Sequence, residues 1–142
     1  MHDNPYRALV VDDESIARDM IVHALEREGF LCDIADNGLD AKSMAEATGY
    51  DAVITDLRMP GGHGYALARD LLTWQHRPLI AVVTSMDDPR LVKDLIACGV
   101  DDVEFKPLHY NLFAAKVSAL AGRRRGIRIN YIQPLIAWKL DR

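Results

Sequence analysis

Short apolar runs alternate five times along the chain with longer segments whose apolar residues recur every three or four positions. Short runs rich in β-branched and aliphatic residues are typical of strands that are buried on both faces of a sheet. The runs predict strands over Tyr6–Val11, Phe30–Ala35, Ala52–Thr55, Leu79–Val83 and Val103–Phe105.

The segments between the runs have the period of an amphipathic helix. They predict helices over Ser15–Glu28, Leu39–Thr48, Tyr65–Trp74, the stretch from Asp88-Pro89 to Gly99, and Tyr110–Ala121. Ile16 and Met20 are expected on the inner stripe of the first helix, and Ile96 on that of the fourth. Strict alternation of strand and helix implies an α/β fold, in which helices cover both faces of a parallel sheet through right-handed crossovers.

The last twenty or so residues fit this alternation less well. One domain is expected over residues 1–122, and residues 123–142 are expected to be a tail or linker of unknown role. Within the tail, Ile127–Ile132 has the composition of a strand and Pro134–Leu140 that of a helical turn. The run Arg123-Arg124-Arg125 is expected to be a solvated helix end that favours the helix dipole.

Composition changes this picture little. The chain has 142 residues, 49% of them hydrophobic, and a formal net charge of −4, which does not favour binding to nucleic acid or to an anionic membrane. No stretch approaches the ~18 apolar residues of a membrane span, and no signal peptide is evident, so a cytoplasmic location is expected. Cys32 and Cys98 have no metal-binding spacing and are expected to be reduced, buried thiols.

Polar residues follow four of the five predicted strands directly. Asp12 and Asp13 follow the first strand, Asp56 the third, Thr84 the fourth and Lys106 the fifth. The carboxyl ends of parallel strands form one edge of a sheet, where ligands usually bind. In a flavodoxin-like sheet of order 2-1-3-4-5, a doubly wound (βα)5 fold, these residues would lie on neighbouring strands about 4.8 Å apart.

Three carboxylates this close raise one another's pKa unless a cation intervenes. Oxygen ligands suit a hard cation, above all Mg²⁺, with Mn²⁺ as a second candidate. Beside such a metal, Asp56 can act as a nucleophile that forms an aspartyl phosphate. Lys106 and the Thr84 hydroxyl would then bind two of the phosphoryl oxygens, and the backbone N–H of Ser85 can contribute as well.

The chain resembles a response-regulator receiver domain of two-component signalling over about residues 6 to 121. The matching pieces, in order and at the spacing of the family, are Val11-Asp12-Asp13-Glu14, Asp56-Leu57-Arg58-Met59-Pro60, Gly64, Thr84-Ser85, Gly99-Val100-Asp101-Asp102 and Lys106-Pro107. The resemblance implies that Asp56 is the phospho-acceptor, and that Thr84 and Lys106 bind the phosphoryl group. It also implies a cis peptide bond between Lys106 and Pro107.

For the metal, the resemblance implies direct ligation by Asp13, Asp56 and the backbone carbonyl of Arg58, with Asp12 acting mainly through water. It implies that a sensor histidine kinase or a phosphotransfer protein donates the phosphate, and that the domain is a switch and not an enzyme acting on other substrates. The family usually has an aromatic residue three positions before the lysine. Here Val103 stands there, so transmission is expected through the loop after Thr84 and the fourth helix.

Several alternatives stay open at this point. A haloacid-dehalogenase-type phosphatase needs Asp-x-Asp after the first strand, and a flavodoxin needs a Ser/Thr/Gly phosphate loop there; this chain has Asp12-Asp13-Glu14. A receiver-like interaction module that is never phosphorylated is the third alternative. Charges of both signs around the fifth helix, such as Lys116 and Glu104, suit either a homodimer through the last two helices and the fifth strand or a solvated face.

Overall fold

The computed structural model describes residues 4–59, 63–85 and 89–132, with side chains as far as Gly126. The strands are β1 (Arg7–Val11), β2 (Leu31–Ala35), β3 (Ala52–Thr55), β4 (Leu79–Thr84) and β5 (Asp102–Phe105). The helices are α1 (Ser15–Arg27), α2 (Gly38–Ala47), α3 (Gly64–Leu72), α4 (Pro89–Cys98) and α5 (Tyr110–Ile132). All ten elements have the predicted type and order, and most bounds agree within one or two residues.

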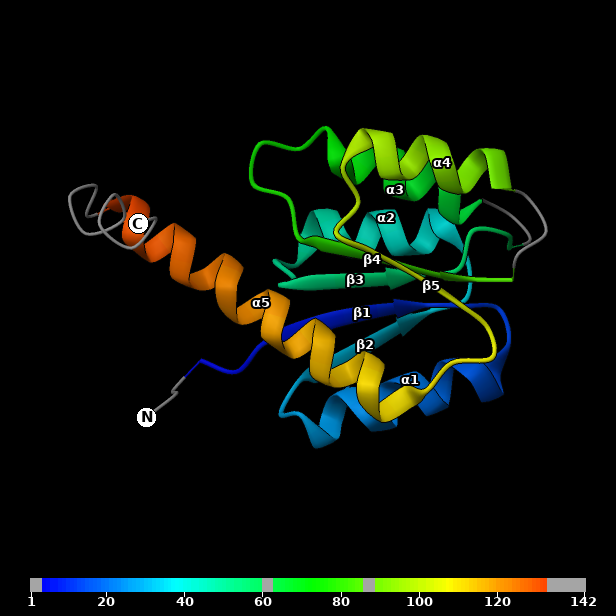
Figure 1. Cartoon of the computed structure of the whole chain (residues 1–142), viewed down its shortest axis with the longest axis horizontal. Coiled ribbons are helices and arrows are strands. Elements are labelled where there is room, and N and C mark those ends of the chain that lie inside the picture. Colours follow the sequence, from blue (N-terminus) through cyan, green and yellow to red (C-terminus); the bar gives the residue numbers. More distant parts are fainter. Residues whose placement is uncertain (1–3, 60–62, 86–88, 133–142) are drawn as a thin grey trace.

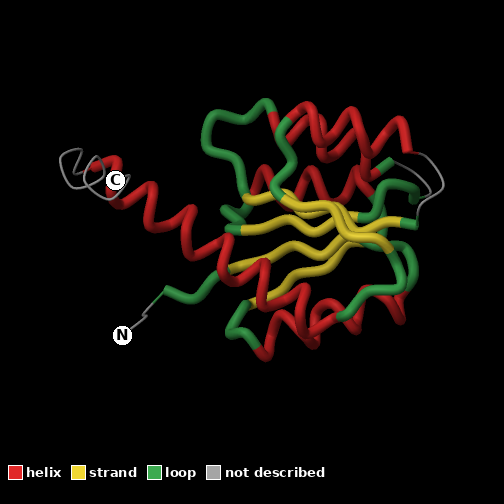
Figure 2. The backbone as a smooth tube through the Cα atoms, in the orientation of Figure 1, coloured by secondary structure: helices red, strands yellow, loops and turns green. Residues whose placement is uncertain are grey.

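The five strands form one parallel sheet in the order β2-β1-β3-β4-β5, the flavodoxin-like order expected from the sequence. Figure 1 shows α1 and α5 on one face of the sheet and α2, α3 and α4 on the other. Every pair of neighbouring strands is parallel, so the carboxyl ends of all five meet at one edge. Figure 2 shows the strands between the two layers of helices.

Strand side chains alternate between two hydrophobic cores, as the pleat of a strand requires. Leu9 and Val11 face the core under α2, α3 and α4, whereas Ala8 and Val10 face the core under α1 and α5. The buried runs that predicted strands are therefore buried because helices cover both faces. No helix of the described residues is long and apolar enough to cross a membrane.

Three side chains that the helical period places inside are exposed. Ile16 is 79% exposed, Met20 47% and Ile96 57%, so the prediction that they line inner helix faces was wrong. The buried residues of α1 are Ile21, Ala24 and Leu25, and Val22 packs partly buried against the same core. Ile16 lies in the first turn of α1, which begins four residues after the end of β1 at Val11, and the buried residues of α1 begin only at Ile21.

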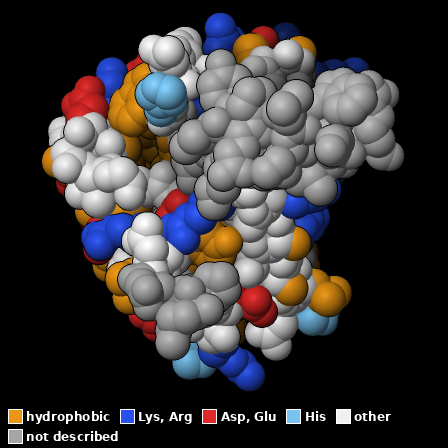
Figure 3. All heavy atoms as spheres, turned by 90° about the vertical axis from the view of Figure 1, so that its left-hand side faces the viewer, with side chains coloured by type: hydrophobic (Ala, Val, Ile, Leu, Met, Phe, Trp, Pro, Cys, Tyr) orange, Lys and Arg blue, Asp and Glu red, His pale blue; other side chains and the backbone are white. Residues whose placement is uncertain are grey.

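Helix α5 is longer than predicted. It continues without a break from Ala121 to Ile132, so the strand considered for Ile127–Ile132 is wrong, while Pro134–Leu140 lies outside the described residues. Figure 1 shows its last turns extending beyond the amino-terminal edge of the sheet. Figure 3 looks onto this edge and shows Lys and Arg side chains at several separate places on it.

Candidate functional site at the carboxyl edge of the sheet

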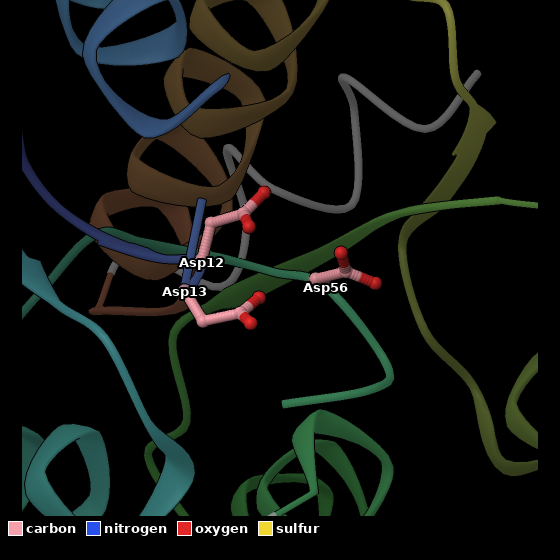
Figure 4. Close-up of side chains that lie close together, drawn as sticks. All are labelled: Asp12, Asp13 and Asp56. Atoms are coloured by element: carbon pink, nitrogen blue, oxygen red, sulfur yellow. The ribbon is translucent and has the colours of Figure 1, made fainter. Parts of the chain in front are cut away.

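Three aspartates project from the ends of two neighbouring strands. Asp12 and Asp13 follow β1, and Asp56 follows β3, which pairs with β1 at Val11 and Thr55. The backbone N–H of Asp56 donates to the carbonyl of Val11 at 3.1 Å, so the pairing continues one residue past the strand end. Figure 4 shows the three side chains together at this edge, as the sequence predicted.

The three carboxylates each have an oxygen within 4.8 Å of the others. Asp12 is buried, Asp56 partly buried and Asp13 exposed. Burial raises the pKa of Asp12, against hydrogen bonds from the Glu14 backbone and Lys106 that lower it. An oxygen-only donor set with one open, exposed side fits a hard divalent cation that keeps several of its waters.

Lys106 reaches into the cluster from the end of β5. Its Nζ lies 2.9 Å from Asp56 Oδ2 and 3.0 Å from Asp12 Oδ2, and its side chain is 18% exposed. Burial acts to lower the pKa of Lys106, but hydrogen bonds to Asp56 and Asp12 outweigh it and hold that pKa above its usual value. The ammonium is therefore charged and partly offsets the repulsion between the carboxylates.

The backbone after β3 fixes the orientation of Asp56. Its Oδ1 accepts from the N–H of Leu57 at 2.6 Å and faces that of Arg58 at 3.4 Å, which leaves Oδ2 to Lys106. The first residue of α3, Gly64, packs against the same turn, since a Cβ there would lie 1.5 Å from the carbonyl oxygen of Asp56. The loop can therefore close onto Asp56 only with glycine at this position.

Thr84 is at the same edge, but it does not contact the aspartates in this structure. It is buried, its hydroxyl donates to the Ser85 carbonyl at 3.2 Å, and its own carbonyl accepts the backbone N–H of Lys106 at 2.9 Å. The peptide bond between Lys106 and Pro107 is cis, as expected. The Arg58 side chain is exposed, and metal ligation by its carbonyl stays a prediction.

Glu14 has a contact that the sequence indicated only weakly. Its Oε1 lies 3.1 Å from Lys106 Nζ, and its backbone N–H donates to Asp12 Oδ1 at 3.0 Å. Its position directly after Asp12-Asp13 was the available signal, and a first-turn helix residue was an equally good interpretation. Glu14 therefore holds two members of the site, one through its side chain and one through its backbone.

Val103, at the position of the expected aromatic, lies on β5 and packs partly buried against the core under α4. A different contact joins the loop after Asp56 to α4. Tyr65 follows Gly64, and its hydroxyl donates to Asp94 of α4 at 2.6 Å, while Arg69 lies 2.7 Å from the same carboxylate. The loop that carries Asp56 is thus linked to α4 through the first turn of α3.

Comparison with known proteins agrees with this geometry. Residues 8–118 match the model of the response regulator receiver domain. The transcriptional regulatory protein ResD of Bacillus subtilis is 32% identical over 120 residues, which are 84% of this chain and 50% of ResD. A cyclic di-GMP phosphodiesterase of Thermotoga maritima is 29% identical over 110 residues, which are 78% of this chain and 29% of that protein.

Among solved structures, the signal receiver domain of a signal transduction histidine kinase from Syntrophus aciditrophicus is similar with a TM-score of 0.74. It is 30% identical, and the match covers 82% of this chain and 90% of that domain. The chain spans half or less of the two longer relatives, whose names indicate different outputs. With the family model matched over most of its length, the chain belongs to the receiver domains of two-component response regulators.

Proposed function

We propose that Asp56 accepts a phosphoryl group and that the domain switches a downstream output when it does so. The observation that carries the proposal is the set of contacts at Asp56. One oxygen is held by backbone N–H groups, and the other lies 2.9 Å from an ammonium, beside two further carboxylates. In the transfer, a bond forms between an Asp56 oxygen and phosphorus while the bond from phosphorus to the donor breaks.

A divalent cation, Mg²⁺ in the first place, would be held by Asp13 and Asp56, with Asp12 acting through water and the Arg58 carbonyl as a further ligand. When bound, it neutralises charge on the carboxylates and on the phosphoryl oxygens. Lys106 would move from the carboxylates to a phosphoryl oxygen. The Thr84 hydroxyl would give up its hydrogen bond to the Ser85 carbonyl and donate to another phosphoryl oxygen instead. It can do so because a hydroxyl hydrogen rotates to suit its acceptor.

Intact-mass spectrometry with acetyl phosphate and Mg²⁺ tests this directly. We expect the chain to gain the mass of one phosphoryl group, to lose the gain with EDTA, and to show none in Asp56→Asn. Asp19→Asn makes the same substitution on the exposed side of α1 and should behave as the parent. No gain in the parent, or a full gain in Asp56→Asn, would contradict the proposal.

Response regulators receive their phosphoryl groups from histidine kinases, and we propose that such a kinase or a phosphotransfer protein serves this chain. The donor must approach the edge that carries Asp56. Ile16 and Met20 of α1 are exposed beside that edge, and the donor would cover them. Ile16→Asp should then slow transfer from the donor protein while leaving transfer from acetyl phosphate unchanged, and equal slowing of both would argue against this contact.

We propose that the signal leaves through α4 and that the domain catalyses at most its own phosphorylation and dephosphorylation. The contact of Tyr65 with Asp94 supports this, because it joins the acceptor loop to α4 without involving Val103. The alternative, an interaction module that phosphorylation does not regulate, would bind its target equally before and after treatment with acetyl phosphate. The mass measurement and a binding assay on the same sample separate the two.

A homodimer through α4, β5 and α5 is a further proposal. Lys116 pairs with Asp102 and Glu104 of its own chain, so these charges do not by themselves require a partner. Exposed Ile96, Phe105 and Leu112 on the same elements offer an apolar contact instead; these residues are 57%, 38% and 64% exposed. Sedimentation velocity should show a dimer with beryllofluoride, and a monomer under all conditions would remove the idea.

A further inference from the structure

Helix α5 continues past the edge of the sheet although its sequence favours an earlier end. Gly122 and Gly126 lie within its last turns, and a glycine inside a helix costs about 1 kcal/mol relative to alanine. Among the side chains that the structure describes, which end at Gly126, Ala121 is the last core residue on the helix. An isolated helical end of this kind frays readily in water, so other contacts must hold it.

Arg125 supplies the first group of such contacts. Its Nε lies 3.2 Å from Asp51 Oδ1 and its Nη2 3.0 Å from Asp51 Oδ2, a two-point pairing that suits the planar guanidinium. Nη2 also donates to the Pro5 carbonyl at 3.2 Å, and the guanidinium carbon lies 4.1 Å from the centre of the Tyr6 ring. The side chains of Arg125 and Asp51 are only 24% and 13% exposed, so solvent screens this pair less than a surface pair.

Arg124 supplies the second group on the neighbouring side of the helix. Its Nη2 donates to the Arg77 carbonyl at 2.8 Å, and its Nη1 lies 3.8 Å from Asp101 Oδ1. Asp101 is itself held in place, because its Oδ2 accepts from the Ile80 N–H and from Arg77, both at 2.8 Å. Arg124 therefore contacts two groups that the fold holds in place, the Arg77 carbonyl and the Asp101 carboxylate.

These partners share a location. Asn4, Pro5 and Tyr6 lead into β1, Asp51 into β3, Arg77 into β4 and Asp101 into β5. The same four strands carry the site residues at their other ends. Arg124 and Arg125 thus attach the end of α5 to the strands that build the phosphorylation site, at the opposite edge of the sheet.

We propose that Arg124 and Arg125 form a clamp that makes the end of α5 part of the folded receiver. The helix through Ile132 then leaves the domain as a rigid arm whose direction the sheet sets. This differs from a solvated terminus, in which the arginines would contact only water and the helix would fray after Ala121. It also places the end of the folded body past the boundary expected at residue 122.

Hydrogen exchange followed by mass spectrometry tests the clamp, and the arginine run contains its own control. Arg123 is exposed and, within the part of the chain that the structure describes, has no hydrogen bond or ion pair. Arg123→Ala therefore removes one charge of the same run and gains the same helix propensity as each single substitution in the clamp variant. We expect the amides of residues 122–132 to exchange at least about tenfold faster in Arg124→Ala/Arg125→Ala, and at the parent rate in Arg123→Ala.

Unchanged protection of this segment in the double variant, or equal loss in Arg123→Ala, would overturn the clamp. The amides of β1 and β3 should keep their protection, which shows that the variant is folded. If the double variant does not fold, Arg125→Lys serves in its place. It keeps the charge but loses the two-point pairing, so it should give a smaller acceleration in the same segment, and parent-like exchange would count against the proposal.

A distance measurement tests the direction of the arm separately. Spin labels at Glu46→Cys on the exposed end of α2 and at Arg128→Cys on the arm, in a chain with Cys32→Ala and Cys98→Ser, should give one narrow distance distribution. The distribution should broaden in Arg124→Ala/Arg125→Ala and stay narrow in Arg123→Ala. A broad distribution in the chain with the intact clamp would show that the arm is not rigid.

Discussion

Replacing Asp13 with asparagine should have opposite effects on stability with and without Mg²⁺. Without the cation, the carboxylates of Asp12, Asp13 and Asp56 repel one another, and the ammonium of Lys106, which pairs with Asp12 and Asp56, partly offsets this repulsion. Asp13→Asn removes one charge at constant shape and should stabilise the domain. With the cation, the same substitution removes a ligand and should abolish the stabilisation that Mg²⁺ gives.

The magnitudes follow from the geometry. Two unit charges 4.8 Å apart repel by about 0.9 kcal/mol in water. Asp13→Asn removes two such repulsions, with Asp12 and with Asp56, and also removes the attraction between Asp13 and Lys106. The free energy of unfolding should therefore rise by roughly 1 kcal/mol. For 142 residues the entropy of unfolding is about 0.3 kcal/mol/K, which turns this gain into a Tm increase of about 3 °C. Free Mg²⁺ at ten times its Kd stabilises the parent by about 1.4 kcal/mol, a Tm increase of about 5 °C.

Differential scanning calorimetry with EDTA, with MgCl₂, and with NaCl of equal ionic strength measures both effects. NaCl should reproduce only the screening of the carboxylates and not the full increase. Glu46→Gln removes a charge from the far end of α2 and should keep the Mg²⁺ increase of the parent. An Asp13→Asn variant that melts lower than the parent in EDTA, or that keeps the Mg²⁺ increase, would refute the reasoning.

Three further outcomes follow from single contacts. Gly64→Ala forces the turn away from Asp56 and should lower the free energy of unfolding by about 2 kcal/mol, with slower phosphorylation in the same mass assay. Lys106→Ala leaves the carboxylates without their ammonium, so the domain should be less stable by about 3 kcal/mol in EDTA and should show a larger Mg²⁺ increase in calorimetry than the parent. Burial, together with nearby carboxylates, raises the pKa of Cys32 to about 12, so little of its thiolate is present at pH 8. Iodoacetamide should therefore modify the exposed Cys98 first, and a faster reaction at Cys32 in peptide mapping would contradict this.

The site could be predicted from sequence because its geometry follows from local information. Each of Asp12, Asp56 and Lys106 directly follows a short apolar run, and parallel strands in one sheet must end at one edge. Strand order then sets which ends are neighbours. The orientation of each side chain needs the loops as well, which is why the backbone N–H groups on Asp56 and the Ser85 carbonyl on Thr84 could not be predicted.

The predictions of buried helix residues were wrong where the apolar stripe of a helix continues past the end of the strand on which the helix packs. Ile16 continues the apolar stripe of α1, but the strand beneath the stripe ends at Val11. At the end of α5 the reverse happens. The local sequence predicts that the helix ends near Gly122, yet Arg125 pairs with Asp51. Asp51 is 74 residues away in the sequence, so a prediction from neighbouring residues does not include this contact. Long-range polar contacts of this kind need the folded chain.

The clamp and the link to α4 have different roles. The clamp fixes the direction of the arm, and the link to α4 can move. The sheet that joins the site to the clamp is hydrogen-bonded throughout and packed on both faces, so it transmits position but hardly bends. Helix α4 is connected to the loop after Asp56 by a half-buried hydrogen bond from Tyr65 to Asp94 and by an exposed ion pair of Arg69 with the same carboxylate. An exposed ion pair rearranges at little cost. Phosphorylation of Asp56 should therefore shift α4 while the labelled distance between α2 and the arm stays the same. A change in that distance with beryllofluoride, at an intact clamp, would mean that the sheet itself carries the signal.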